Sequence, residues 1–140
     1  MLFFYLFITL KWGDFMWVKY SNNPYGLNGS IDDCVVRALS VLLDQTWDET
    51  YTNLALLGIA QGKMPSNNAV HISYLKQHGY KMHIPSSDCP DCITVREFSE
   101  RYPNGDYFLA CGDHVVALIQ GNYYDVFDSG DEVIVYYFSK

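Results

Sequence analysis

Basic residues are scarce in this chain. Nine lysines and arginines stand against sixteen aspartates and glutamates, which gives a formal net charge of -7. Proteins that bind nucleic acids use clustered Lys and Arg side chains to neutralise phosphates. The sequence has no such cluster, so we expect neither a nucleic acid nor an anionic membrane as a partner.

Long hydrophobic runs are also missing. The opening segment MLFFYLFITL has ten residues, too few to cross about 30 Å of hydrocarbon at roughly 1.5 Å per helical residue. It lacks the basic start and the small-residue cleavage site of a secretory signal. Ordinary domain sequence follows a second methionine, Met16. Our hypothesis is that translation begins at Met16, with residues 1–15 as an upstream extension.

Cysteine is limited to Cys34, Cys89, Cys92 and Cys111. Without a signal peptide, four cysteines indicate reduced thiols in a cytoplasm and not a disulfide framework. The CPDC motif has the spacing of half a zinc site or of a redox pair, but no second CxxC or HxxxH motif accompanies it. We therefore predict no metal and no organic cofactor, and keep a small metal or redox module as a third functional class.

Apolar residues, in contrast, are plentiful. They make up 49% of the 140 residues, enough for one buried core, so we predict one domain over residues 16–140. Ser30 with Asp33, and Thr46 with Glu49, resemble capping boxes at the starts of helices. Apolar spacing and stop signals predict a first helix of roughly ten residues with Cys34 in its first turn, and a second that starts at Thr46 and stops around 58–62. Two more helices are predicted at 67–77 and 94–101, and strands at 80–84, 107–111, 114–119, 123–127 and 133–138.

The order of these elements predicts the fold class. Most of the helices come first and antiparallel strands, separated by turn residues, follow. This order is typical of α+β proteins and differs from the strand-helix alternation of parallel sheets. We predict N-terminal helices packed on a C-terminal antiparallel sheet.

Cys34 is the candidate nucleophile. A reactive thiol needs a position that favours thiolate, a base to take its proton and a third group to orient that base. The predicted first turn of a helix supplies the first requirement, because its free N–H groups stabilise negative charge. Asp32 and Asp33 oppose this effect unless they point away or cap the helix.

His114 is the candidate base, because it opens the apolar strand HVVALI at the end of the predicted sheet. Asp125 and Asp128 compete to orient it. A three-residue hairpin loop at 120–122 would place Asp128 directly across from His114, whereas a two-residue loop at 121–122 would give Asp125 the right parity. Asp125 would then lie roughly 10 Å along the strand from Asp128. We predict Asp128.

Asn28, six residues before Cys34, is the candidate oxyanion donor. A tetrahedral intermediate needs hydrogen-bond donors for its oxygen, and a side-chain amide can act beside the backbone N–H of the nucleophile.

The order amide, Cys, His and Asp resembles that of papain-like cysteine peptidases, closest to the compact branch that cleaves bacteriocin leaders. The segments NPYGLNGSIDDCVVRALS, CPDC and GDHVVALIQGNYYDVFDSGD also resemble small proteins of Gram-positive bacteria and their phages. The resemblance implies Cys34 as nucleophile, His114 as base and Asp128 as orienting residue. The chain departs from the family by Asn28 in place of Gln, by two acids before Cys34, and by lacking the aromatic after it.

These observations predict a papain-like cysteine hydrolase or acyl transferase. Its substrate would be a peptide, an isopeptide, or another amide or ester, and a host or phage protein is one such partner. The alternative is a catalytically silent domain of the same fold that acts as a binding or inhibitory module.

Overall fold

A computed structural model describes residues 16–26 and 32–140. The hypothesis of an extension at residues 1–15 concerns a segment outside these ranges. The described residues form four helices and six strands: α2 (Cys34–Leu43), α3 (Trp47–Gln61), α4 (Asn68–Gln77), α5 (Val95–Arg101), β1 (Trp17–Lys19), β2 (Lys81–His83), β3 (Asp106–Ala110), β4 (Val115–Ile119), β5 (Asn122–Asp125) and β6 (Tyr136–Ser139). The predicted α+β class is confirmed.

The six strands form one sheet in the order β1-β5-β4-β3-β6-β2. All neighbours are antiparallel except β1 and β5, which run parallel. The prediction of a purely antiparallel sheet is therefore wrong at this edge. The three residues of β1 are too few to show a strand pattern, and their place comes from pairing with Tyr123–Asp125, far along the chain.

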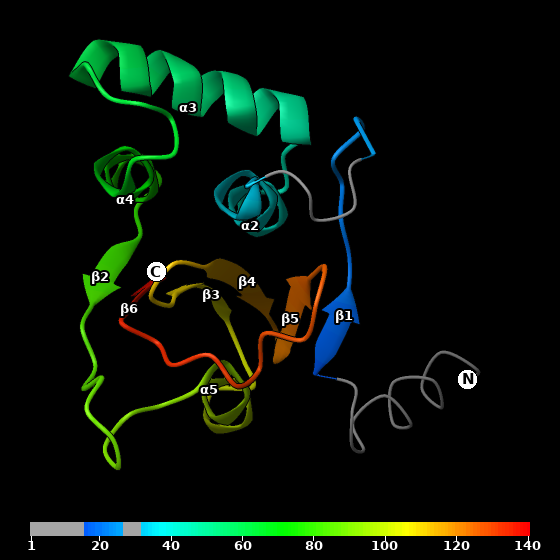
Figure 1. The fold of residues 1–140 in the computed structure, drawn as a ribbon, viewed down its shortest axis with the longest axis vertical. Coiled ribbons are helices and arrows are strands. Elements are labelled where there is room, and N and C mark those ends of the chain that lie inside the picture. The colour runs from blue at the N-terminus through cyan, green and yellow to red at the C-terminus, as the bar shows by residue number, and fades with distance from the viewer. Residues whose placement is uncertain (1–15, 27–31) are drawn as a thin grey trace.

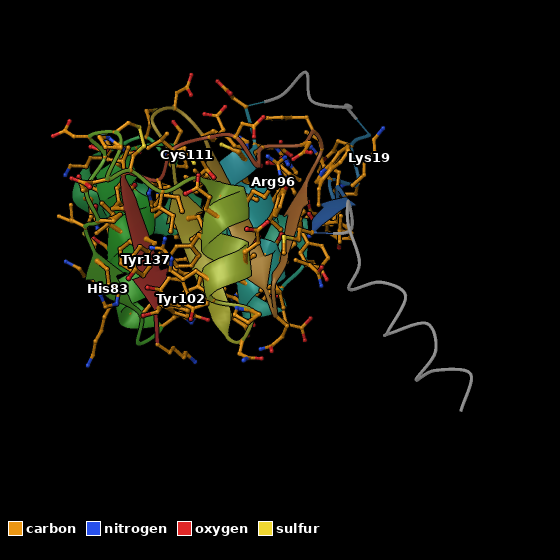
Figure 2. All side chains as sticks on the ribbon, turned by 90° about the horizontal axis from the view of Figure 1, so that it is seen from below. Lys19, His83, Arg96, Tyr102, Cys111 and Tyr137 are labelled. Atoms are coloured by element: carbon orange, nitrogen blue, oxygen red, sulfur yellow. A yellow bond between two sulfur atoms is a disulfide. The ribbon has the colours of Figure 1, made fainter. Side chains whose placement is uncertain are left out.

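The helices lie on both faces of the sheet. Figure 1 shows α2, α3 and α4 on one side and α5 on the other. Figure 2 views the molecule from the α5 side, with α5 in front of the sheet and Tyr102 and Tyr137 near it. Two apolar clusters fill the spaces between these layers. The first contains Leu39, Leu54, Val70, Leu75, Phe108, Ala117 and Phe138, and the second contains Val95, Phe98, Leu109, Val116, Leu118, Tyr123 and Ile134.

Local capping signals determine where three helices begin. The Thr46 hydroxyl accepts a hydrogen bond from the Glu49 backbone N–H, and Thr94 and Asn67 cap their helices in the same way. These three starts agree with the sequence prediction. The start of α2 differs, because Asp33 occupies the cap position but makes no side-chain capping bond. Ser30, its predicted capping partner, lies outside the described residues.

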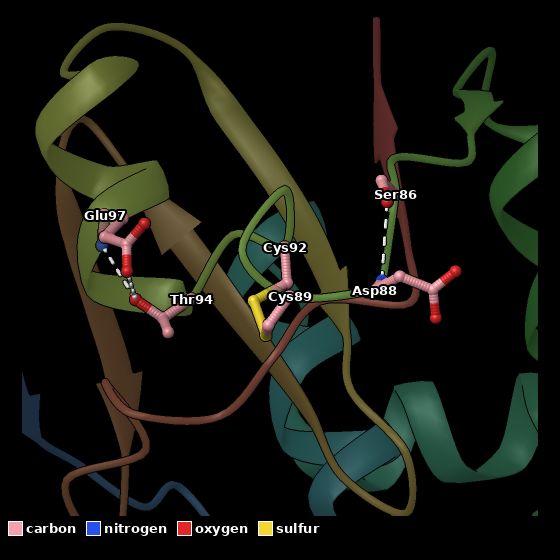
Figure 3. Close-up of a disulfide and its surroundings, with 6 residues drawn as sticks. All are labelled: Ser86, Asp88, Cys89, Cys92, Thr94 and Glu97. Carbon is pink, nitrogen blue, oxygen red and sulfur yellow. Dashed lines mark hydrogen bonds between the residues drawn. A yellow bond between two sulfur atoms is a disulfide. The ribbon is translucent and has the colours of Figure 1, made fainter.

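The CPDC motif lies in the loop between β2 and α5. Cys89 and Cys92 form a disulfide, with their Cα atoms 4.6 Å apart, just before the Thr94 cap of α5 (Figure 3). The expectation of four reduced thiols is wrong for this pair, because its short spacing brings the two sulfurs within bonding distance. The bond also occupies both thiols that a zinc site would have used.

No helix within residues 16–26 and 32–140 is long and apolar enough to cross a membrane. Placement in a cytoplasm remains a prediction.

Candidate active site

Cys34 is the first residue of α2, which packs against β3, β4 and β5. The side chain is partly exposed and lines two cavities, of about 750 and 320 Å³. His114, in the turn just before β4, lines both cavities as well. The structure therefore brings the predicted nucleophile and the predicted base together in an open cleft.

The His114 imidazole interacts with both Asp125 and Cys34. Its Nε2 atom lies 2.6 Å from Oδ2 of Asp125, and the Cys34 thiol is near enough to raise the pKa of the ring. Because Asp125 engages Nε2, Nδ1 is the nitrogen left for proton exchange with Cys34.

Charge at the site follows from these contacts. Burial lowers the pKa of His114, but the interactions with Asp125 and Cys34 outweigh burial and raise the pKa to about 9. The ring is therefore positively charged at neutral pH. A cation at this point stabilises a negative charge on the Cys34 sulfur.

Asp125, and not Asp128, is the partner of His114. The hairpin pairs Ala117 with Tyr124 and Ile119 with Asn122, so its loop is the two residues 120–121. Both have positive φ, 49° and 83°, as a type I′ turn requires. The sequence analysis considered loops at 120–122 and at 121–122, but not one at 120–121, because Gln is an uncommon first residue in such a turn.

The register explains why the prediction of Asp128 across from His114 is wrong. Continued three residues beyond the last ladder pair, the register places Phe127 opposite His114, and their ring centroids lie 4.8 Å apart. Asp125 is then the diagonal neighbour on the same side, and Asp128 has the opposite parity. Asp128 instead accepts hydrogen bonds from Tyr123 and Arg96.

Asp125 is held by a buried network that the sequence analysis missed. The side chain is 1% exposed, and its Oδ2 also accepts a hydrogen bond from Ser129 Oγ at 2.7 Å. Its Oδ1 accepts from Arg37 at 3.1 Å and from the Val126 backbone N–H at 2.8 Å. Burial raises the pKa of Asp125, but the bonds from His114 and Ser129 outweigh it and lower the pKa.

Arg37 joins this carboxylate to the start of α2. Its Nε donates to Oδ1 of Asp33 at 2.8 Å while its Nη1 donates to Asp125. Asp33 also accepts hydrogen bonds from the Trp47 indole and from Asn23. Asp33 is therefore turned inward and compensated, and its charge opposes a thiolate at Cys34 less than the sequence suggested. The spacing of Asp33 and Arg37, one helical turn, was the available signal.

The remaining candidates lie apart from this cluster. Asn28 falls outside the described residues. Cys111 is buried just after β3, where burial and nearby carboxylates raise its pKa to about 12. Cys89 and Cys92 line neither of the two cavities. Within residues 16–26 and 32–140 there is no group of three or more His, Cys, Asp or Glu side chains arranged to hold a metal ion.

Comparison with known proteins finds no family model that matches the chain, no significantly similar curated protein and no significantly similar solved structure. The geometry of the cleft therefore carries the functional argument.

Proposed function

We propose that the chain is a papain-like cysteine hydrolase or acyl transferase with Cys34, His114 and Asp125 as its triad. The observation that carries this proposal is the His114 imidazole, which is bonded to the buried Asp125 carboxylate and lines the same two cavities as the Cys34 thiol. A helix that begins with the nucleophile and packs on an antiparallel sheet that presents the base is also the arrangement of the papain-like fold. Asp125 takes the role that was predicted for Asp128.

The chemistry proceeds in two steps. The Cys34 thiolate attacks the carbonyl carbon of an amide or ester, and His114 gives its proton to the departing amine or alcohol, which leaves a thioester on Cys34. Water or a second amine then attacks the thioester, His114 takes the proton of the attacking group, and Cys34 is released. Asp125 holds the imidazole orientation throughout.

The oxygen of each tetrahedral intermediate needs donors. The backbone N–H of Cys34 is one of the first N–H groups of α2, which have no acceptor within the helix. The Asn28 amide is our proposed second donor, as the sequence predicted.

Alkylation of Cys34 tests the proposal without a known substrate. Iodoacetamide labelling, followed by peptide mass spectrometry from pH 5 to 9, should be fast at Cys34 even below pH 7. The reason is that His114 carries its positive charge below its raised pKa of about 9, and so at pH 5 to 7. His114→Gln should slow labelling at pH 6 by at least about tenfold, since one charge contact of this kind contributes more than about 1.4 kcal/mol.

His83→Gln is the matched control. His83 is exposed, bonds Ser139 on the far strand pair, and lines neither cavity. It should leave Cys34 labelling unchanged. Labelling of Cys34 no faster than that of free N-acetylcysteine, and indifferent to His114, would reject the enzyme and favour the silent binding module of the same fold.

A further inference from the structure

The outer side of α3 is apolar and faces away from the rest of the described chain. α3 packs on α2 and α4, and Figure 1 shows these two helices between α3 and the sheet. The inward residues Leu54 and Gly58 are buried. On the outer side, Leu56 is 61% exposed and Ile59 is 78% exposed, and Met64, just beyond the helix, is 72% exposed. α3 is therefore apolar on its outer side as well as on the side that packs.

Charge is absent from the middle of this helix. Residues 50–62, TYTNLALLGIAQG, include no Asp, Glu, Lys or Arg. A surface helix normally carries charged and polar side chains toward the solvent. The exposed side chains of α3 within this stretch, which we call the α3 face, are those of Tyr51, Thr52, Leu56, Ile59 and Ala60. An exposed apolar surface of this kind is typical of a site that binds another protein.

Charged residues stand at the two ends of the α3 face. Glu49 lies in the first turn of α3, beside Asp48, and Lys63 directly follows the Gly62 cap. Both Glu49 and Lys63 are exposed, and neither forms an ion pair within the part of the chain that the structure describes. The α3 face thus has a negative end and a positive end, with apolar side chains between them.

This charge pattern fits a second copy of the same face. Glu49 lies seven residues before Leu56, and Lys63 lies seven residues after it. If two α3 helices pack antiparallel about a two-fold axis at Leu56, Glu49 of each copy meets Lys63 of the other copy. A parallel pair would instead bring Glu49 against Glu49 and Lys63 against Lys63, which is unfavourable. Charge therefore favours an antiparallel pair.

We propose that the α3 face is a homodimer interface, in which two antiparallel α3 helices bury Leu56 and Ile59 of both copies between Glu49–Lys63 ion pairs. The small side chains of Thr52 and Ala60, each four residues from Leu56, let the two helices approach closely. α3 has 15 residues and is about 22 Å long at roughly 1.5 Å per residue. Interfaces of this small size are weak, so we expect a Kd on the order of 10–100 μM.

The dimer leaves the candidate active site open. None of the described residues that line the two cavities at Cys34 belongs to α3. The inference therefore goes beyond the proposed function and does not depend on it, and its test uses the mass of the particle in solution and not the reactivity of Cys34.

Sedimentation velocity of the full chain, from about 2 to 500 μM, tests the apolar part of the interface. The wild type should change from monomer to dimer across this range. Ile59→Lys should raise the Kd at least about tenfold, because it places a charge where the two helices exclude water. Ile84→Lys is the matched control: Ile84, just after β2, is 77% exposed, nearly the same as Ile59, and its replacement should leave the Kd unchanged.

Charge reversal tests the antiparallel arrangement. Lys63→Glu should raise the Kd about fivefold, because it replaces two attractive contacts by two repulsive ones, and Glu49→Lys should do the same. The double Glu49→Lys/Lys63→Glu variant exchanges the two charges and should restore the wild-type Kd. About 0.5 M salt should reduce the differences between these variants. In a parallel dimer, Lys63→Glu alone would leave the Kd unchanged, since like charges would still meet.

Each outcome supports or overturns the interface. A wild type that stays monomeric at 500 μM rejects it, and so does association that Ile59→Lys weakens no more than Ile84→Lys does. A Kd that Lys63→Glu does not change, or that the double variant does not restore, rejects the antiparallel pair. All the substituted positions are exposed, and circular dichroism spectra that match the wild type show that each variant is folded.

Discussion

Asp125 and Asp128 are three residues apart, and each is paired with an arginine, yet their surroundings are opposite. Asp125 is 1% exposed and receives hydrogen bonds from Arg37, His114 and Ser129. Asp128 is 43% exposed in its side chain and pairs with the equally accessible Arg96. The difference shows that burial and strand parity, and not proximity in sequence, decide which carboxylate can act on His114.

The same comparison separates two kinds of ion pair. An exposed pair is screened by water and contributes little to stability. A buried pair costs desolvation, but removing one member leaves an uncompensated charge, which is strongly destabilising. Arg37 pairs with two buried carboxylates, Asp33 and Asp125. Its replacement is therefore the clearest test of the difference between buried and exposed ion pairs.

The largest expected effect is that of Arg37→Met. It leaves Asp33 and Asp125 buried without their cation, and should lower the free energy of unfolding by about 3–5 kcal/mol. Arg96→Met is the matched control and should cost less than about 1 kcal/mol, since Arg96 is 40% exposed. Urea unfolding followed by circular dichroism measures both. Similar losses in the two variants would contradict the contrast drawn between the two pairs.

The second expected effect is a pH dependence of stability. Burial lowers the pKa of His114, and the interactions with Asp125 and Cys34 raise it to about 9, above the unfolded value of about 6.5. A raised pKa stabilises the fold fully below about pH 6.5, and that stabilisation is lost as the pH rises through 9. The free energy of unfolding should therefore fall by on the order of 3 kcal/mol across this range.

Asp125→Asn should flatten this dependence, because it removes a principal interaction that raises the pKa of His114. NMR titration of the His114 ring proton should then give a pKa well below that of the wild type, while Asp128→Asn should leave it in place. An unchanged His114 titration in Asp125→Asn would show that the ion pair does not set its charge. Asp125 itself acts at the other end of the scale: its lowered pKa adds stability above about pH 3.8 that is lost on acidification.

Much of the fold could be predicted because its signals are local. The caps at Thr46, Asn67 and Thr94, and the stop at Gly79, lie within a few residues of the helix ends that they determine. Strand patterns likewise predicted five of the six strands to within a few residues, with only β1 missed. Cys34 and His114 were selected as candidates for the same reason, since Cys34 begins α2 and His114 directly precedes β4, and neighbouring residues specify both elements.

The rest could not be predicted because it depends on contacts between distant residues. One residue of register, set by the turn at Gln120 and Gly121, decides whether Asp125 or Asp128 reaches the side of His114. The spacing of Asp33 and Arg37 was a local signal that the two could pair. Asp125, which also bonds Arg37, is 88 residues away from it in sequence and gave no such signal. The edge strand β1 depends in the same way on β5.

The smallest expected effect is that of Asp128→Asn. The variant removes one charge from an exposed cluster, in which Asp128 accepts bonds from Tyr123, Arg96 and the Gly130 backbone. Hydrogen bonds can persist to the Asn oxygen, so stability should fall by less than about 1 kcal/mol. Iodoacetamide labelling of Cys34 should stay at the wild-type rate, whereas Asp125→Asn should slow it. If Asp128→Asn slows labelling as much as Asp125→Asn, both aspartates act on His114, and burial is not what distinguishes them.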